Sequence, residues 1–262
     1  MIQRKLRNKH TRFASLLLSA FITTVAIPEV ALSQNSERDY FKQGNIHLEE
    51  NNLQQAIESY TRAIELHPDF ANAYYNRGVA YREQGNFRQA IQDYTQAIEL
   101  NPDYAAAYNN RGVAYYKQGN FRQAIQDYTQ AIELNPDDAN AYYNRGVAYR
   151  EQGNFRQAIQ DYTQAIELNP DNATAYNNRG VAYYKQGNFR QAIQDLNQAI
   201  ELNPDDANAY SNRGNVYDEQ GNFRQAIQDY NQAIEINPDN AQAYYNRGFA
   251  YYKQGNFRQA IQ

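Results

Sequence analysis

The sequence predicts an all-α protein built from stacked 34-residue helix–turn–helix repeats, and three observations lead to this fold class. Six prolines are each 34 residues apart, at Pro68, Pro102, Pro136, Pro170, Pro204 and Pro238. Two sets of glycines, which begin at Gly44 and Gly85, keep the same spacing. Between these markers, apolar residues recur at the three- and four-residue intervals of amphipathic helices. A fixed period in this range is typical of repeat proteins whose units stack on one another.

The composition narrows the possible chemistry. The 262 residues include no cysteine, so disulfides, thiolate catalysis and cysteine-ligated zinc are ruled out. Three histidines leave little room for imidazole catalysis, and the sequence contains no catalytic triad, metal motif or phosphate-binding loop. We therefore expect a protein that is not an enzyme and that uses no cofactor and no metal. The net charge of −4 argues against nucleic-acid binding, which usually requires a basic surface.

Residues 1–33 have the features of a secretory signal peptide. The first twelve residues carry five Lys and Arg side chains, and a mainly apolar run follows from Phe13 to Ile27. Ala31 and Ser33 then place small residues before Gln34, as a cleavage site requires. The apolar run is short for a membrane span, although an uncleaved signal anchor is the alternative. Cleavage would change the net charge from −4 to −8, and we expect a periplasmic or secreted protein without a membrane span.

The rest of the chain divides into repeats. After a short leader at 34–36, six complete repeats cover 37–240 and a truncated seventh covers 241–262. Each complete repeat has positions 1 to 34, with its proline at position 32. Repeats one to six are therefore residues 37–70, 71–104, 105–138, 139–172, 173–206 and 207–240.

Repeat three illustrates the two helices that each repeat is expected to form. In its first helix Tyr108, Gly112 and Tyr115 lie on one stripe. In its second helix the apolar residues also follow helical spacing, at Phe121, Ala124, Ile125, Tyr128, Ala131 and Ile132. We expect the small residues Gly112 and Ala124 to let the two helix backbones approach closely, with aromatic rings packed around them.

Turn residues set the predicted helix ends. Gly119 is suited to the left-handed position that ends a helix. Asn120 can then cap the second helix, with Gln123 as its capping-box partner. Pro136 stops that helix because it lacks an amide donor and restrains the residue before it. Asp137 or Asp138 is then available to cap the next helix.

Charged residues also follow the period. Arg stands at position 7 and Asp at position 23 of repeats two to six, as in the pair Arg77 and Asp93. Repeat one lacks both residues and has Gln43 and Ser59 instead. We predict an Arg–Asp contact within each of these five repeats, with a structural role.

The repeat resembles the tetratricopeptide repeat family. That family has an aromatic residue at position 4, Gly at 8, Tyr at 11, Ala at 20, an aromatic at 24, Ala at 27 and Pro at 32. Repeat two supplies these residues as Tyr74, Gly78, Tyr81, Ala90, Tyr94, Ala97 and Pro102. The resemblance covers 37–262. It implies a right-handed superhelical solenoid whose first helices line a concave groove, with positions 2, 5, 6, 9, 12 and 13 in or near it.

On this resemblance, position 6 supplies the main candidate binding residues. They are one asparagine in each repeat from the second onward: Asn76, Asn110, Asn144, Asn178, Asn212 and Asn246. A primary amide offers a donor and an acceptor, which suits an extended peptide backbone. The row looks like the asparagine ladder of the O-linked N-acetylglucosamine transferase superhelix. The alternative is that these side chains bond within or between repeats.

Further candidates alternate from repeat to repeat. Position 5 contributes an aromatic side chain in repeats two, four and seven, and positions 12 and 13 contribute Arg or a Tyr–Lys pair. These candidates are Tyr75, Tyr143, Tyr245, Arg82, Tyr116, Lys117, Arg150, Tyr184 and Lys185. Tyr side chains are common at interfaces, and a mixed charge pattern favours a partner with complementary charges. The alternative is a solvated face with aromatics packed between repeats.

These observations favour a non-catalytic scaffold that binds a protein or peptide segment in the groove, since repeat arrays present extended concave surfaces. Two other functions remain open, namely a carbohydrate-binding role in the cell envelope and an accessory region of a longer enzyme. At the last repeat, Phe257, Ala260 and Ile261 lack the rest of their helix. For that end we expect a fragment, a premature stop, or an end covered by self-association.

Overall fold

The computed structural model describes residues 36–261, and this part of the chain folds into fourteen helices. The predicted signal segment lies outside the described residues. The helices are α1 (Glu37–Glu49), α2 (Leu53–Leu66), α3 (Ala71–Glu83), α4 (Phe87–Leu100), α5 (Ala105–Lys117), α6 (Phe121–Leu134), α7 (Ala139–Glu151), α8 (Phe155–Leu168), α9 (Ala173–Lys185), α10 (Phe189–Leu202), α11 (Ala207–Glu219), α12 (Phe223–Ile236), α13 (Ala241–Lys253) and α14 (Phe257–Ala260).

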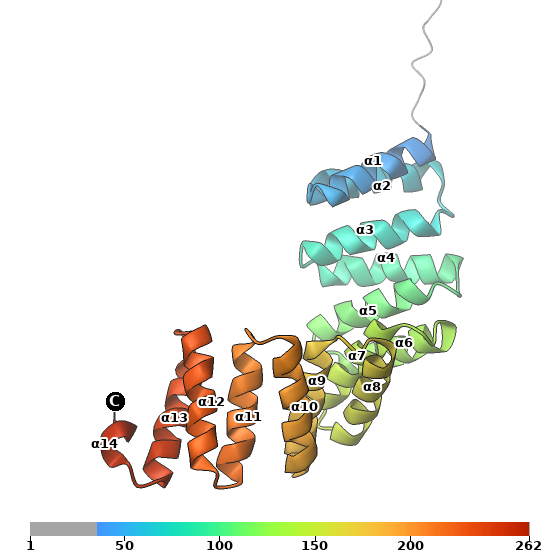
Figure 1. Ribbon diagram of the computed structural model, residues 1–262. Coiled ribbons are helices and arrows are strands. Elements are labelled where there is room, and N and C mark those ends of the chain that lie inside the picture. Colours follow the sequence, from blue (N-terminus) through green and yellow to red (C-terminus); the bar gives the residue numbers. More distant parts are fainter. Residues whose placement is uncertain (1–35, 262) are drawn as a thin grey trace, which may run out of the picture. The chain divides into compact units, whose positions relative to one another are not determined.

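The helices form pairs that stack in chain order, which confirms the predicted solenoid of helix–turn–helix repeats. Figure 1 shows the pairs following one another from α1–α2 at the blue end to α13–α14 at the red end. Each helix packs on the next one along the chain. Each odd-numbered helix also touches the next odd-numbered helix, whereas consecutive even-numbered helices of the described chain do not touch. The odd-numbered helices therefore lie where neighbouring repeats come closest, and we call their side of the stack the inner face.

The helices of a repeat are held together by a glycine that faces a buried ring. A Cβ placed on Gly112 would lie 2.7 Å from Cε1 of Tyr128, so only glycine allows this approach. Tyr128 is 2% exposed, and Ala124 beside it is fully buried. Burial of an aromatic side chain of this size contributes roughly 2 to 3 kcal/mol to folding. The close approach that the sequence predicted for repeat three is confirmed.

The turn inside each repeat depends on one left-handed residue. Gly119 has φ of 78°, and the equivalent glycines have φ between 75° and 86°. Repeat one places Asn51 there, with φ of 59°, which asparagine tolerates better than other side chains. The backbone N–H groups of Gly119 and Asn120 donate to the carbonyls of Tyr116 and Tyr115, each at 2.9 Å. These bonds satisfy carbonyls at the end of α5.

The predicted capping box of the second helix is wrong. Asn120 stands at the N-cap of α6, but its side chain makes no capping hydrogen bond. Its amide instead donates to Gln118 Oε1 at 3.4 Å. In a capping box, the backbone N–H of the N-cap residue donates a hydrogen bond to the side chain at position N3. That N–H already donates to the Tyr115 carbonyl, so Gln123 has no donor to bind.

The first helices begin differently. Asp138 caps α7, because its Oδ1 accepts from the N–H groups of Asn140 at 2.9 Å and Ala141 at 3.3 Å. This confirms one of the two caps expected after Pro136. Phe70 and Tyr104 stand at the equivalent place before α3 and α5 and make no such bond. Their rings pack against the hydrophobic core instead.

The predicted Arg–Asp contact occurs in all five repeats that carry both residues. In repeat three, Nε and Nη2 of Arg111 donate to the two carboxylate oxygens of Asp127, each at 2.8 Å. Arg111 also donates from Nη1 to Thr95 of the preceding repeat at 3.0 Å, and its guanidinium lies 5.5 Å from the ring centre of Tyr108. Burial raises the pKa of the Asp127 carboxyl, although Arg111 acts in the opposite direction. The arginine thus joins two repeats, a link that the period alone did not reveal.

Candidate protein-interaction surface

The asparagine row lies on the odd-numbered helices, and the structure uses its amide nitrogens between repeats. Each of the six asparagines at position 6 donates from Nδ2 to an oxygen atom of the preceding repeat, over 2.8 to 3.2 Å. The accepting oxygens belong to Asn45, Tyr75, Asn109, Tyr143, Asn177 and Asn215. The row is therefore part of the contact between neighbouring repeats, which is the alternative that the sequence left open.

The amide oxygens of the row differ from one repeat to the next. Asn110 accepts a hydrogen bond from Arg82, and Asn178 accepts one from Arg150 at 2.9 Å. The Oδ1 atoms of Asn76, Asn144 and Asn212 accept from no donor within residues 36–261. An acceptor oxygen on the inner face therefore recurs in every second repeat. This spacing follows from position 12, where Arg alternates with Tyr in repeats two to five. Arg82 and Arg150 donate to the amide oxygens of the repeats that follow them.

Two of the candidate tyrosines at position 5 are half-buried against aromatic rings of their own repeats. The ring centre of Tyr75 lies 4.8 Å from that of Tyr104 and 5.8 Å from that of Tyr94. Tyr143 lies in the same way against Tyr162, at 5.9 Å. Burial raises the pKa of both position-5 tyrosines, so their hydroxyls keep their protons at neutral pH. The two rings therefore pack within their own repeats, and their hydroxyls accept from Asn110 and Asn178 of the next repeats.

The Tyr–Lys pairs of repeats three and five are more accessible. Tyr116 packs on Phe121, with 5.4 Å between ring centres, and Tyr184 packs on Phe189 at 6.1 Å. Lys117 and Lys185 are exposed, and the Lys185 ammonium lies 5.4 Å from the Tyr184 ring centre. By contrast, Arg150 is partly buried and is paired with Glu151, and Arg82 is paired with Glu83. The lysines are thus the cations that a ligand on the inner face can reach most directly.

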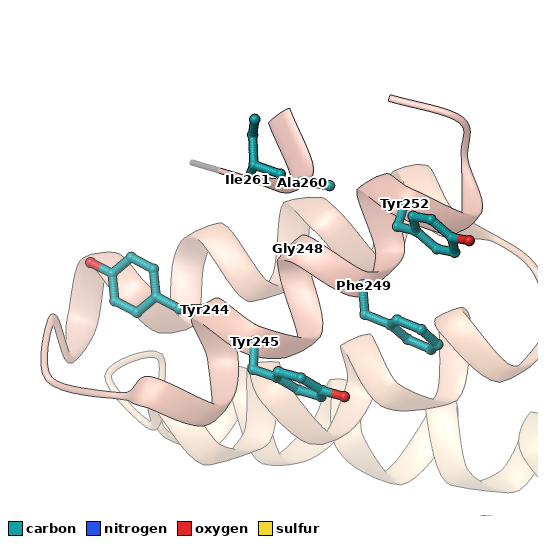
Figure 2. Close-up of a pocket in the computed structure, with 7 residues that line it drawn as sticks. All are labelled: Tyr244, Tyr245, Gly248, Phe249, Tyr252, Ala260 and Ile261. Atoms are coloured by element: carbon teal, nitrogen blue, oxygen red, sulfur yellow. The ribbon is translucent and has the colours of Figure 1, made fainter. Parts of the chain in front are cut away.

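The last repeat exposes an aromatic surface. Tyr245, Phe249 and Tyr252 follow one another on α13, with 6.4 and 6.3 Å between successive ring centres, and Tyr245 is 68% exposed. Figure 2 shows these three rings on one side of α13 and Ala260 and Ile261 on the other. A groove of about 330 Å³ is lined by Tyr244, Tyr245, Gly248, Phe249, Tyr252, Ala260 and Ile261.

That groove corresponds to the place where a complete repeat packs its second helix. In repeat three the ring of Tyr128 covers Gly112. Around Gly248, the nearest atom to an added Cβ is the carbonyl oxygen of Ala260, at 3.2 Å. Since α14 has four residues, the face of α13 that a second helix covers elsewhere is left open here. Phe257 and Ile261 are correspondingly exposed.

Sequence models of a known repeat family match this chain. The "TPR repeat" model matches residues 44–85, 79–119, 146–187, 182–221 and 214–255. Two models described as "Tetratricopeptide repeat" match residues 105–138 and 127–160. The chain belongs to the tetratricopeptide repeat family.

Solved structures of other tetratricopeptide repeat proteins are similar to this chain. "YrrB: a TPR protein with an unusual peptide-binding site" is 25% identical, with a TM-score of 0.63 over 72% of this chain and 97% of that one. The MamA protein is 26% identical, with a TM-score of 0.60 over 65% of this chain and 93% of that one. A tetratricopeptide repeat protein from Parabacteroides merdae is 24% identical, with a TM-score of 0.69, and the match covers 86% and 89% of the two chains. No curated protein sequence matches the chain.

Membership of the tetratricopeptide repeat family makes this chain a protein–protein interaction scaffold in general terms. Its fold is typically a non-catalytic one. Among residues 36–261, no helix combines the length and apolar character that crossing a bilayer requires.

Some inner-face residues of this tetratricopeptide repeat protein were not among the sequence candidates for binding. Asn45 and Asn215 at position 9 each accept from a buried tyrosine hydroxyl as well as from the asparagine of the next repeat. Asn109 and Asn177 at position 5 take the role that Tyr75 and Tyr143 have elsewhere. The sequence signal for these acceptors was the alternation of tyrosine and asparagine at position 5 in repeats two to five. Where asparagine replaces tyrosine, its side-chain oxygen replaces the tyrosine hydroxyl as acceptor.

Proposed function

We propose that this protein is a non-catalytic scaffold that binds an extended segment of a partner protein along its inner face. The observation that carries the proposal is the set of unoccupied amide oxygens at Asn76, Asn144 and Asn212. A peptide backbone offers N–H donors along its whole length, whatever its side chains are. Acceptors fixed in place by contacts between repeats can bind such donors with little loss of side-chain freedom.

The related structure of a TPR protein with an unusual peptide-binding site supports this choice of ligand. That protein is 25% identical to this chain and has the same fold over 72% of it. The peptide-binding site belongs to that protein, and its presence there favours a peptide over other ligand classes here.

The exposed lysines supply the selectivity that backbone contacts lack. Lys117 and Lys185 stand two repeats apart on the inner face, beside the rings of Tyr116 and Tyr184. Acidic side chains on the partner segment complement these two cations, and aromatic or aliphatic side chains pack against the rings. A partner that is acidic at two separated places along an extended segment fits this arrangement.

A binding experiment with matched variants tests the proposal. Peptides selected from a random library against residues 34–262 would be measured for affinity by calorimetry. We expect Lys117→Ala together with Lys185→Ala to weaken the selected peptides about tenfold. The control is Arg122→Ala together with Arg190→Ala, which removes two exposed charges from the even-numbered helices α6 and α10. Failure to select any peptide, or an equal loss in the control, would contradict the proposal.

We further propose that the protein works outside the cytoplasm after removal of residues 1–33. The basic start, the apolar run and the small residues before Gln34 support this location. Expression of the full chain in a bacterium, followed by N-terminal sequencing of the purified product, tests it. We expect the mature chain to begin at Gln34 and to be recovered outside the cytoplasm. A product that keeps residues 1–33 would contradict cleavage.

A further inference from the structure

Repeats three and five are nearly the same sequence, and one of their differences changes the core. Over their 34 residues they differ at three positions: Ala106 and Thr174, Tyr128 and Leu196, and Thr129 and Asn197. Leu196 stands at position 24, where the other five complete repeats have tyrosine. The rings of those five tyrosines are at most 2% exposed and fill the space between the two helices.

A cavity is found at the leucine. It has a volume of about 130 Å³ and is lined by Val181, Tyr184, Lys185, Leu196, Asn212 and Asn215. In repeat three, Val113 packs against the buried cluster that contains Tyr128. Leucine is shorter than tyrosine, and Leu196 and Val181, the equivalent of Val113, both line the cavity. The cavity therefore takes up space that a phenol ring fills in the neighbouring repeats.

The size and lining of the cavity suit one aromatic ring. An apolar cavity of about 150 Å³ in another protein binds benzene, and the 130 Å³ found here is close to that size. Val181, Leu196 and the Tyr184 ring supply an apolar wall.

The polar part of the lining selects a ring that carries a hydroxyl group. Asn212 uses its nitrogen to donate to Asn177, which leaves its Oδ1 without a donor within residues 36–261. Asn215 accepts from Tyr230 and from Asn246 through Oδ1, and its Nδ2 has no acceptor within the same residues. Both asparagines line the cavity, so an acceptor and a donor are available beside it. A phenol hydroxyl can donate to the first and accept from the second.

We propose that this cavity is a subsite for a tyrosine side chain of the partner segment. The inference rests on the proposed peptide-binding function. It predicts that one position of the bound peptide is a tyrosine. A wider depression of about 310 Å³ shares Tyr184 and Lys185 with the cavity and also contains Glu219. This depression offers room for the main chain next to the inserted tyrosine.

The cavity can be tested without any peptide, by using p-cresol as the analogue of a tyrosine side chain. Chemical-shift changes in two-dimensional NMR of isotope-labelled 34–262 would report both its affinity and its place of binding. We expect p-cresol to perturb the amides of Val181, Leu196 and Asn215. Toluene, which lacks the hydroxyl group, is expected to bind at least tenfold more weakly. Equal binding of toluene would contradict the role of Asn212 and Asn215.

Two substitutions at position 24 give matched controls. Leu196→Tyr supplies the ring that other repeats carry, so it should fold and should abolish p-cresol binding at this site. Leu196→Met keeps the volume and should retain the binding. A p-cresol site that survives Leu196→Tyr would overturn the proposal.

Peptide selection then separates the subsite from the general function. Peptides selected by the wild-type protein are expected to share a tyrosine at one register, and peptides selected by Leu196→Tyr are expected to lose that preference but keep the others. If no peptide is selected while p-cresol binds at Leu196, the proposed scaffold function fails and the cavity is a phenol-binding site without a peptide partner. If peptides bind with no aromatic preference, the tyrosine subsite is wrong while the scaffold function stands.

Discussion

Repeat three, residues 105–138, and repeat five, residues 173–206, have the same frame around different cores. Both have the left-handed glycine turn and the Arg–Asp pair. Repeat three fills its centre with the Tyr128 ring, whereas repeat five has Leu196 and a cavity of about 130 Å³. The comparison teaches that the frame is independent of the residue at position 24, because turn and ion pair involve other positions. The residue at position 24 can therefore change, and open or fill a cavity, without loss of the turn or the ion pair.

The largest expected effect is the response of the protein to alkali, which comes from the tyrosine at position 24 that repeat three has and repeat five lacks. Burial raises the pKa of Tyr60 to about 12, and it also raises the pKa of Tyr128. Unfolded tyrosines ionise near pH 10 while these stay protonated, so the free energy of unfolding is unaffected below pH 10 and falls as pH rises from 10 to 12. Five such tyrosines would cost about 7 kcal/mol at pH 11.

Denaturant unfolding at a series of pH values checks this expectation. Tyr128→Leu should reduce the slope of the unfolding free energy above pH 10 by about 1.4 kcal/mol per pH unit, and Leu196→Tyr should increase it by the same amount. An unchanged slope in both variants would show that the ring at position 24 is not protected from ionisation.

The second effect concerns the Arg–Asp ion pair that is present in each of the two repeats. Asp127→Asn and Asp195→Asn each leave a partly buried arginine without its counter-charge, with side-chain exposures of 16% for Arg111 and 15% for Arg179. We expect a loss of about 3 kcal/mol in either repeat. Thermal or denaturant unfolding measures it. A large difference between the two variants would contradict the independence of frame and core. The double variant Arg111→Leu/Asp127→Leu, which removes both charges, should recover much of the loss.

The third effect tests how rigid the two cores are. A Cβ on Gly112 would lie 2.7 Å from a ring carbon of Tyr128, and a Cβ on Gly180 would lie 2.9 Å from Cγ of Leu196. Gly112→Ala should destabilise by about 2 kcal/mol, since a buried ring has little room to move. Gly180→Ala should cost about 1 kcal/mol, because Leu196 can shift towards the cavity and alanine favours the helix. Equal losses would mean that the cavity gives Leu196 no freedom.

The smallest effect concerns the link between repeats. Thr129 accepts from Arg145 at 3.1 Å, and Asn197 accepts from Arg213 at 2.7 Å. Both residues present one oxygen to a guanidinium group, so the exchanges Thr129→Asn and Asn197→Thr should each change stability by about 0.5 kcal/mol or less. Thr129→Val, which removes the acceptor, should cost about 1 kcal/mol. Calorimetric melting compares the three variants.

The sequence alone predicted much of the fold, because the decisive contacts join residues within one repeat at fixed separations. Gly112 and Tyr128 are both set by the period, and so are Arg111 and Asp127. The candidate site was less predictable. An asparagine on the inner face has the same local sequence whether its amide contacts a ligand or the preceding repeat. Asn144 was therefore identified as an inner-face residue, while its bond to Asn109 was not.

The sequence by itself thus determined the repeat, its two helices, the glycine turn and the paired charges, since each depends on neighbours within a few helical turns. The tertiary structure decided which amide oxygens stay unoccupied and that Leu196 opens a cavity. Each of these outcomes depends on competition for a donor or for space. In such a competition the winning atom belongs to another helix, and only packing brings it within reach.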